Sequence, residues 1–537
     1  MGSPIDELRE AVEAVAAELA NSSTAVPTLE RPKKAGFGDY STNAAMLLAP
    51  ALKAPPRDVA ERLGAALTER LGERIARVEV AGPGFLNVFL ADAWYTAAAA
   101  HVLAAGDDWG GGTAAVRERV NLEFVSANPT GPLTAASGRH AAYGDALARL
   151  LEFAGHEVTR EYYFNDAGGQ LLRLGESIRA RARGEAVTED GYQGDYVAEL
   201  AAALPDAAER DAEDLAVAGG ALMIERIKEM LERYRVHFDV WFSERTLRDG
   251  AIDRAFAHVE KAGHSYRHEG ALWLRTTAFG DDQDRVIERS NGEPTYYAAD
   301  VAYVENKLER GWERLIMPLG SDHHGYIPRF KAAMAVAGAD PDKLEVPLLQ
   351  FVHLVEKGSR ASMSKRRGEF ITLDDLIGEI GVDATRFFML QRSHDSTIDL
   401  DLDLAREESA ENPVYYVQYA HARIASVLRK AGEERVAEAL ADSGAGLALD
   451  PAERELVKKL LAFPAEAGEA ATRRAPHRIA VYALELAQPF TAFYRDCRVV
   501  GAEPRQLESF RIGLCVTARR TVARALGLLG VSAPDSM

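Results

Sequence analysis

The sequence predicts an α/β protein whose central parallel-sheet domain follows a small α+β domain and precedes an all-α helical bundle. Three observations predict this organisation. Strand-like and helical segments alternate from about residue 111 to residue 400, the first 110 residues combine helices with two short strands, and the pattern from Asn412 onward is wholly helical. We therefore expect three domains, at 1–110, 111–400 and 401–537.

The elements of the first domain follow from local patterns. An amphipathic helix is expected over Ile5–Leu19, and Gly82-Pro83-Gly84 separates two strand-like runs within Val78–Leu90. The glycine-rich stretch Gly106–Gly112 is expected to be a linker. In the central domain, the acidic, Ala-rich stretch at about 180–235 predicts a helical insertion on the sheet.

Length and composition are those of a folded, soluble chain. The 537 residues allow about three or four units with cores of their own, and 47% hydrophobic with 27% charged residues excludes disorder as the main state. Cys497 and Cys515 are too few for a disulfide framework and lack neighbours at zinc-ligand spacing. The chain has neither a leader pattern nor an apolar run of about 20 residues, so we expect a cytoplasmic protein without a membrane partner.

Charge is distributed unevenly. The net charge of −19 argues against general adhesion to a polyanion such as DNA, yet residues 451–537 hold 13 Lys and Arg against nine Asp and Glu. Two explanations stay open for this basic tail: a solvated helical bundle of mixed charge, or a patch that binds one nucleic acid.

The first strand of the central domain leads into a turn that suits phosphate. Val120–Val125 alternates as a strand, and Ser126–Pro132 ends it before a long helix that Thr134 or Ser137 can cap. A strand, a Gly/Pro turn and a helix N-terminus present backbone N–H groups and a positive dipole to an anion. Phosphate binding is therefore a hypothesis, although many strand–turn–helix units bind nothing.

The residues around this turn resemble a known family. The run Asn121–Leu133 (NLEFVSANPTGPL), with Gly138-Arg139 and Tyr162–Gly168 (YYFNDAG), resembles bacterial arginyl-tRNA synthetase, a class I enzyme with a Rossmann-like catalytic domain. Further blocks of the resemblance are Phe37–Tyr40, Ala81–Phe85, Thr295–Asp300, Gly320–Tyr326 and Asn412–Arg423. Because these blocks span the chain, the resemblance implies an N-terminal tRNA-binding domain, a class I catalytic domain and an anticodon-binding helical domain.

The resemblance implies an arginine–tRNA ligase. Such an enzyme activates L-arginine with ATP to arginyl-adenylate and transfers it to the 3′ end of tRNA(Arg); we expect a monomer that needs bound tRNA for activation, with Mg2+ carried by ATP. Two alternatives stay open: a non-catalytic relative that binds only tRNA or arginine, and a tRNA-independent enzyme that makes a small product from activated arginine.

The first signature of the family is altered in this chain. Where the family has His-x-Gly-His, whose imidazoles bind ATP phosphates, this sequence has Thr134-Ala-Ala-Ser137. Both replacements keep a hydroxyl that can donate a hydrogen bond, so we predict Thr134 and Ser137 as catalytic donors, with helix capping as an equal alternative. Gly138 and Arg139 are predicted to bind the nucleotide.

The second signature is a basic loop between glycines, Gly358–Gly368, in which Ser362 stands where the family's first lysine does. We predict that Lys365 is catalytic, neutralising charge on the departing pyrophosphate, and that Met363, Ser364 and Arg366 contact the nucleotide with it. Without the resemblance, an exposed basic turn would explain the segment.

Arginine itself constrains its pocket. A guanidinium stays charged and presents five donors, so it needs carboxylates and amide or phenol acceptors. By resemblance we assign Glu123, Tyr296 and Asp300 to the guanidinium end of the substrate and Asn128 to its α-amino or carboxylate end. Tyr296 and Asp300 are four residues apart, so on a helix they share a face.

The remaining assignments also follow the resemblance. Gly320, Asp322 and His323 are assigned to the nucleotide; no third ligand stands at suitable spacing from the adjacent histidines, so no metal site is predicted. The predicted tRNA contacts are Phe85, Asn87, Tyr416, Tyr419, Arg423, Arg495 and Met537. Aromatic side chains stack on splayed bases, but most aromatic residues in helices belong to a core, which is the ordinary alternative here.

Overall fold

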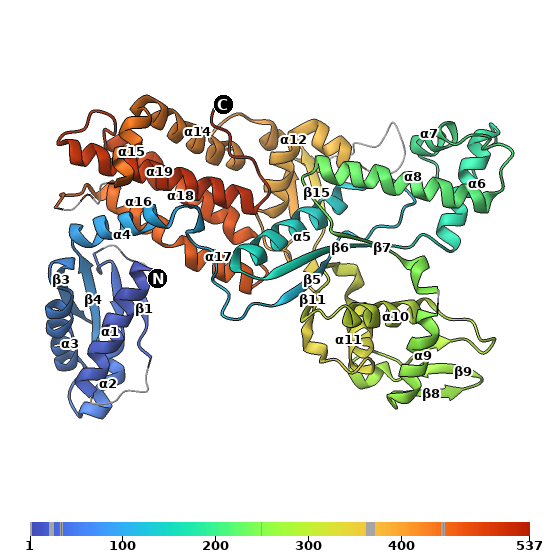
Figure 1. The fold of residues 1–537 in the computed structure, drawn as a ribbon, viewed down its shortest axis with the longest axis horizontal. Coiled ribbons are helices and arrows are strands. Elements are labelled where there is room, and N and C mark those ends of the chain that lie inside the picture. The colour runs from blue at the N-terminus through green and yellow to red at the C-terminus, as the bar shows by residue number, and fades with distance from the viewer. Residues whose placement is uncertain are drawn as a thin grey trace.

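The chain forms an elongated molecule of three parts. The computed structural model describes residues 3–20, 26–32, 34, 36–248, 250–360, 371–441, 444 and 446–537. A small N-terminal domain and a helical C-terminal domain share one end, and the α/β domain extends to the other (Figure 1). Across the described ranges, every helix is too short or too polar to span a bilayer.

The N-terminal domain is a four-stranded antiparallel sheet with helices packed on it. The strand order is β1-β2-β4-β3, and the predicted Gly-Pro-Gly turn joins β3 to β4. Gly84 in that turn has φ of +142° and lies so close to Pro56 that a Cβ would not fit. The elements are α1 (Pro4–Ala20), β1 (Leu29–Glu30), β2 (Tyr40–Thr42), α2 (Ala44–Leu52), α3 (Pro56–Leu71), β3 (Ile75–Ala81) and β4 (Phe85–Leu90).

Five parallel strands form the central sheet, in the order β13-β11-β5-β6-β7. They are β5 (Arg119–Glu123), β6 (Glu157–Phe164), β7 (Val240–Ser243), β11 (Arg314–Ile316) and β13 (Leu344–Glu345). From β5 the chain proceeds to β6 and β7 on one side and later returns to β11 and β13 on the other. The carboxyl end of β5 is therefore a topological switch point, the place where open α/β sheets bind ligands.

Helices cover both faces of this sheet. α5 (Ala135–Ala154) and α12 (Leu373–Leu390) lie on the side of the helical domain, whereas α10 (Tyr296–Glu309) and α11 (Ile327–Val336) lie on the opposite side (Figure 1). Successive side chains at the end of β11 therefore point to opposite faces of the sheet. Ile316 joins the core around α5, while Leu315 and Met317, the residue after β11, join the core around α10 and α11.

Two excursions extend the sheet domain. The predicted insertion is helical and starts directly after β6, with α6 (Gly169–Ala182), α7 (Asp195–Ala203) and α8 (Ala212–Arg233). The second excursion carries a three-stranded antiparallel sheet in the order β10-β9-β8. Its elements are α9 (Ala251–Lys261), β8 (Ser265–His268), β9 (Ala271–Leu274) and β10 (Arg285–Glu288). Short elements follow: β12 (Leu319–Gly320), β14 (Leu348–Leu349), β15 (Val352–Glu356), β16 (Ser359–Arg360), β17 (Ile398–Asp401) and α13 (Leu402–Arg406).

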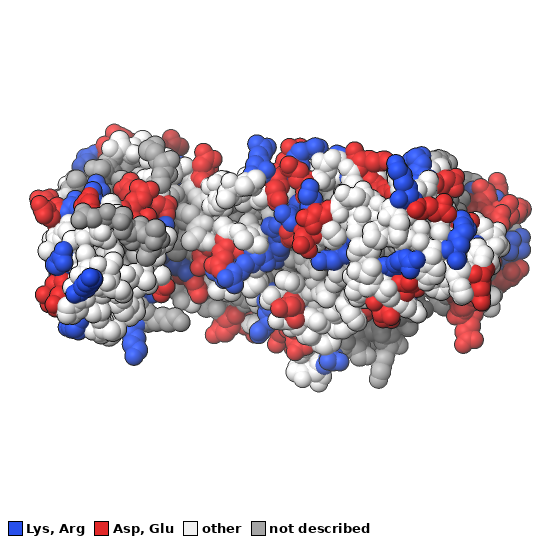
Figure 2. Space-filling view, turned by 90° about the horizontal axis from the view of Figure 1, so that it is seen from below, with Lys and Arg blue, Asp and Glu red and all other residues white. Residues whose placement is uncertain are grey.

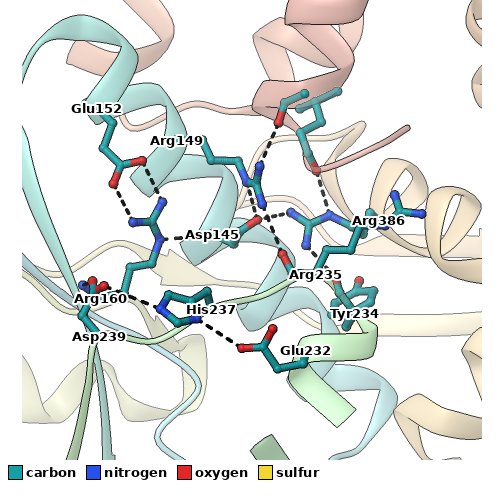
Figure 3. A network of polar contacts seen from close by, with 12 residues as sticks. Asp145, Arg149, Glu152, Arg160, Glu232, Tyr234, Arg235, His237, Asp239 and Arg386 are labelled. Carbon is teal, nitrogen blue, oxygen red and sulfur yellow. Dashed lines mark hydrogen bonds and ion pairs between the residues drawn. The ribbon is translucent and has the colours of Figure 1, made fainter. Parts of the chain in front are cut away.

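The C-terminal part is helical throughout its described residues, as the sequence predicts. Its helices are α14 (Pro413–Ala431), α15 (Glu433–Ala441), α16 (Pro451–Leu461), α17 (Phe463–Thr472), α18 (His477–Asp496) and α19 (Arg505–Leu528). The connecting helix α4 (Asp92–Ala105) packs against α16 and α19. A polar network around Asp145 and Arg386 joins the end of α19 to α5 and α12 (Figure 3).

Candidate active site

A cavity of about 430 Å³ opens at the carboxyl end of β5. It brings together five residues predicted from the sequence: Glu123, Ser137, Gly320, Asp322 and His323. The other lining residues are Phe124, Val125, Ser126, Ala136, His140, Met317, Pro318, Leu319, Tyr326 and Phe330. The cavity therefore lies between the end of β5, the first turns of α5 and the segment after β11.

The turn after β5 has an unusual backbone. Val125 and Ser126 have φ of +66° and +43°, a left-handed conformation that a β-branched residue rarely adopts. Two hydrogen bonds hold the turn: Ser126 Oγ donates to Glu123 Oε1 at 3.0 Å and accepts from the backbone N–H of Tyr163 at 3.1 Å. Such strain costs about 1–3 kcal/mol per residue and concentrates at functional sites.

A buried charge network lies behind Glu123. The fully buried Lys307 ammonium is 3.0 Å from Glu123 Oε2 and 3.0 Å from Glu161 Oε1, and Tyr303 donates its hydroxyl to both carboxylates. Arg310 donates two hydrogen bonds to Glu161. Burial opposes ionisation of Glu161, but Lys307 and Arg310 outweigh it and hold the pKa of this carboxyl well below its usual range. The sequence analysis missed this network; the i, i+4 spacing of Tyr303 and Lys307 was the available signal.

Further carboxyls lie beside Glu123. Burial and the charges of Glu244 and Glu123 raise the pKa of Asp300 to about 7. Tyr163 donates its hydroxyl to Glu244 at 2.5 Å. Asp300 is thus close to two carboxylates, Glu123 and Glu244. A bound cation would stabilise this cluster. The sequence analysis did not name Glu244.

Tyr296 lies elsewhere. It begins α10, four residues before Asp300, but its side chain is 74% exposed and lines a separate cavity of about 510 Å³ beside Glu244 and Ala299. No contact between Tyr296 and Asp300 is recorded among the residues that the structure describes. Asp300 lines neither of these two cavities, so the structure does not bring Tyr296 and Asp300 to one space.

Three predicted ligand contacts have other partners. Arg139 is buried and donates to the backbone carbonyls of Gln350, Phe351, Ser393 and Ser396, so its guanidinium points into the protein rather than into the cavity. A Cβ at Gly138 would lie 2.6 Å from a methyl carbon of Leu373, so Leu373 would have to shift, and the glycine favours close packing of α12 on α5. Asn128 donates to Gln170 and accepts from the backbone of Asn165, and it does not line the cavity.

The two hydroxyl residues of the altered signature have different positions: Thr134 caps α5, and Ser137 lines the cavity. Thr134 is the N-cap of α5: its hydroxyl accepts from the Ser137 backbone N–H at 3.2 Å, and Thr134 does not line the cavity. Ser137 does line it, with its hydroxyl 3.1 Å from that of Thr134. The predicted capping role of Thr134 is therefore confirmed.

Met363, Ser364, Lys365 and Arg366 lie outside the described residues. The chain that follows them is anchored at the start of α5, since Ala135 donates its N–H to the Ile371 carbonyl and Leu373 donates to the Leu133 carbonyl. On the other side, the chain enters this segment from β16, which pairs with β15.

Some of the predicted RNA contacts are exposed and others are buried. Phe85 is 39% exposed at the start of β4, whereas Asn87 is only 4% exposed and faces the domain interior. On α14 and α18 the Arg423 guanidinium lies 4.6 Å from the ring centre of Tyr419 and 4.9 Å from that of Tyr494, and Tyr415 stacks on Tyr419. Tyr494 was not predicted.

The other predicted RNA contacts are Tyr416, Arg495 and Met537. Tyr416 contacts Thr491, Met537 is 54% exposed, and Arg495 is paired with Asp496, which partly neutralises its guanidinium. Several further cations of the tail are paired as well: Lys458 with Asp39, Lys459 with Glu485, Arg474 with Glu345, Arg478 with Glu466 and Arg519 with Asp535. Basic and acidic side chains are also intermingled over the face that Figure 2 presents, which is the molecule seen from below.

Comparison with family models covers most of the chain. Residues 6–90 match the arginyl tRNA synthetase N terminal domain, residues 209–426 match the tRNA synthetases class I (R) catalytic domain, and residues 417–537 match the DALR anticodon binding domain. These matches follow the order of the three parts of the fold.

Individual relatives agree with the models. An arginine–tRNA ligase of Frankia alni is 47% identical over 95% of this chain and 94% of its own, and one of Geobacillus kaustophilus is 43% identical over 99% and 98%. A crystal structure of a putative arginyl-tRNA synthetase from Campylobacter jejuni covers 83% of this chain and 100% of its own, at a TM-score of 0.77 and 34% identity. With identities this high over nearly the whole length, the chain belongs to the arginyl-tRNA synthetase family.

Proposed function

We propose that this chain is an arginine–tRNA ligase. In the first step the carboxylate of L-arginine attacks the α-phosphate of ATP and pyrophosphate leaves; in the second, a hydroxyl of the terminal adenosine of tRNA(Arg) attacks the arginyl carbonyl and AMP leaves. The observation that carries the proposal is the cavity at the end of β5, which is lined both by the first turn of α5 and by the Glu123 carboxylate.

The charges around Glu123 support a guanidinium as the bound side chain. Glu123 and Glu161 are balanced by Lys307 and Arg310, so these four groups together are close to neutral. Asp300 and Glu244 add acidic groups beside this set, and a cation that enters the pocket is attracted mainly by them. Tyr303 and Lys307 fix the orientation of Glu123, and a fixed carboxylate suits the planar fork of a guanidinium.

The nucleotide is proposed to lie on the other side of the cavity. Ser137, in the first turn of α5, and Asp322, Gly320 and His323, after β11, surround that space. The helix dipole at the start of α5 favours phosphate. The N–H groups of Ala135 and Ser137 there are already bonded to the Ile371 carbonyl and the Thr134 hydroxyl. By the family resemblance, Lys365 is proposed to neutralise charge on the departing pyrophosphate.

Magnesium is proposed to arrive with ATP. The described residues contain no group of three or more His, Cys, Asp and Glu side chains that could hold a metal ion. Mg2+ retains water and binds substrate phosphates readily, so its donors would come from ATP and solvent. The expectations of a monomer, a cytoplasmic location and no DNA or membrane partner stay predictions.

The matched relatives disfavour the two alternatives, since they carry the ligase name and align over both RNA-binding parts. ATP–pyrophosphate exchange with L-arginine tests the assignment directly. We expect exchange that depends on tRNA(Arg). Exchange that is equally fast without tRNA would support the tRNA-independent alternative, and no exchange under any condition would support the non-catalytic one.

A further inference from the structure

We propose that His140 contacts the ribose–phosphate part of ATP and supplies an imidazole donor to the nucleotide site of this chain. The inference rests on the proposed function and adds a residue that neither signature of the family includes. His140 lies one turn after Ser137 on α5, and both residues line the cavity at the end of β5. Residues three positions apart on a helix are neighbours on one face, so the two side chains border the same space.

The environment of His140 places it on the nucleotide side of the cavity. The charged groups that act on its ring are Arg139, Asp322 and His323, whereas Glu123 acts on Asp300 at the other side. Asp322 and His323 belong to the segment assigned to the nucleotide. A ligand that contacts Ser137 and Asp322 therefore occupies the cavity that His140 also lines.

The ring is neutral and has a free hydrogen-bonding capacity. Burial and the charge of Arg139 lower the pKa of His140 to about 4, so at neutral pH one ring nitrogen carries a proton and the other is an acceptor. In the described part of the chain, no hydrogen bond to the His140 ring is recorded. A neutral polar ring that borders a cavity and lacks a protein partner is suited to a ligand.

The donor inventory of the cavity supports this role. Among its described lining residues there is no Lys or Arg, and its carboxylates, Glu123 and Asp322, repel phosphate. Arg139, the nearest cation in sequence, is directed to four backbone carbonyls. The side-chain donors left to the nucleotide in these walls are Ser137, His140, His323 and Tyr326. His140 thus provides an imidazole on the helix whose first turn lacks the family's two histidines.

Three variants test the proposal: His140→Ala removes the ring, His140→Asn keeps an N–H near the position of Nδ1, and His140→Gln keeps one near that of Nε2. We expect His140→Ala to lower kcat/KM for ATP about 10- to 100-fold, with KM for arginine unchanged, as for loss of one donor to an anionic substrate. Either Asn or Gln restores most of the loss. His237→Ala is the control, because His237 is largely exposed and outside the cavity.

Binding of a non-reactive arginyl-sulfamoyl-adenosine, measured by calorimetry, separates this inference from the function itself. We expect weaker binding by His140→Ala than by the wild-type chain and partial recovery with Asn or Gln, whether or not the chain charges tRNA. Wild-type binding and wild-type KM for ATP in all three variants would overturn the role of His140. An equal loss for arginine and ATP, with a matching fall in Tm and no rescue, would also overturn it and show a packing role.

Discussion

Asp145 of α5 and Arg386 of α12 form an ion pair inside the protein, with Nη2 of Arg386 2.5 Å from Asp145 Oδ2 and both side chains at most 1% exposed. Arg386 also donates Nε to the Leu529 carbonyl and Nη1 to the Tyr234 carbonyl (Figure 3). One guanidinium therefore joins α5, the helix that borders the candidate active-site cavity, to the end of α19 and to the loop before β7. The interface between the α/β domain and the helical domain thus contains a buried ion pair whose guanidinium has hydrogen-bond partners on both sides.

Breaking this pair should destabilise the whole chain. Asp145→Asn or Arg386→Met leaves a buried group without its charged partner, and we expect either variant to lose about 3–5 kcal/mol of unfolding free energy. Urea denaturation measures the loss, and the double variant shows the coupling. Arg226→Met, which breaks an exposed pair with Glu199, should cost less than about 1 kcal/mol. Equal losses for the buried and the exposed pair would contradict this explanation of the junction.

Glu123→Gln tests the substrate pocket. The change removes a carboxylate that Lys307 and Tyr303 orient, and we expect kcat/KM for arginine to fall about 100-fold or more while KM for ATP changes little. Steady-state aminoacylation with each substrate varied in turn measures both constants. Glu118→Gln is the matched control, since Glu118 precedes the same strand at its opposite end and pairs with Arg314. A similar loss in both variants would point to general damage of β5.

The raised pKa of Asp300 predicts a pH dependence of arginine binding. Because its pKa is about 7 in the free protein, acidification below pH 7 protonates Asp300 and weakens the attraction for guanidinium. We expect KM for arginine to rise by up to about tenfold per pH unit below pH 7 and to be flat above pH 8. In Asp300→Asn this inflection should disappear; an inflection that persists there would assign it to another group.

The same shift has a consequence for stability, with the opposite sign to a salt-bridged carboxylate. The folded chain binds a proton on Asp300 more tightly than the unfolded chain, whose pKa is near 3.8, so ionisation between about pH 4 and pH 7 destabilises the fold. Asp300→Asn should therefore raise Tm at pH 8 and change it little at pH 4. A lower Tm at pH 8 would contradict this sign.

Sequence patterns predicted the elements whose signals are local. The helix over Ile5–Leu19, the Gly-Pro-Gly turn and the cap at Thr134 depend on periodicity and turn chemistry within a few residues, and the structure confirms them. The central parallel sheet also follows, since alternating strands and helices leave few other arrangements.

Side-chain roles set by distant segments could not be predicted in this way. Arg139 donates to carbonyls more than 200 residues away, and Lys307 reaches Glu123 and Glu161 from another layer of the fold. Asn87 has a family-like position but lies inside its domain. Only the packing of strands and helices decides whether a polar side chain faces a cavity, a partner or the core.

The two hydroxyls of the altered signature should behave differently. Thr134→Ala removes the N-cap of α5 and should cost about 1 kcal/mol of unfolding free energy with little change in KM for ATP. Ser137→Ala removes a cavity donor and should lower kcat of ATP–pyrophosphate exchange about tenfold with a small change in Tm. Identical effects of the two substitutions on exchange would show that the hydroxyls act as one unit.

Arg423→Ala tests the aromatic surface of the helical domain. The Arg423 guanidinium contacts the rings of both Tyr419 and Tyr494, and its loss removes a cation and these two ring contacts. We expect KM for tRNA(Arg) to rise about tenfold, with KM for ATP unchanged. Arg226→Ala, on the insertion, should leave KM for tRNA(Arg) unchanged. An unchanged KM for tRNA(Arg) in Arg423→Ala would contradict an RNA contact at Arg423.

Charging of a tRNA(Arg) transcript by the purified chain, with ATP, Mg2+ and L-arginine, tests the assigned activity most directly. We expect arginine to become attached to the terminal adenosine, and a transcript of another specificity, such as tRNA(Lys), to stay uncharged. A folded, monodisperse preparation that leaves tRNA(Arg) uncharged would contradict the assignment.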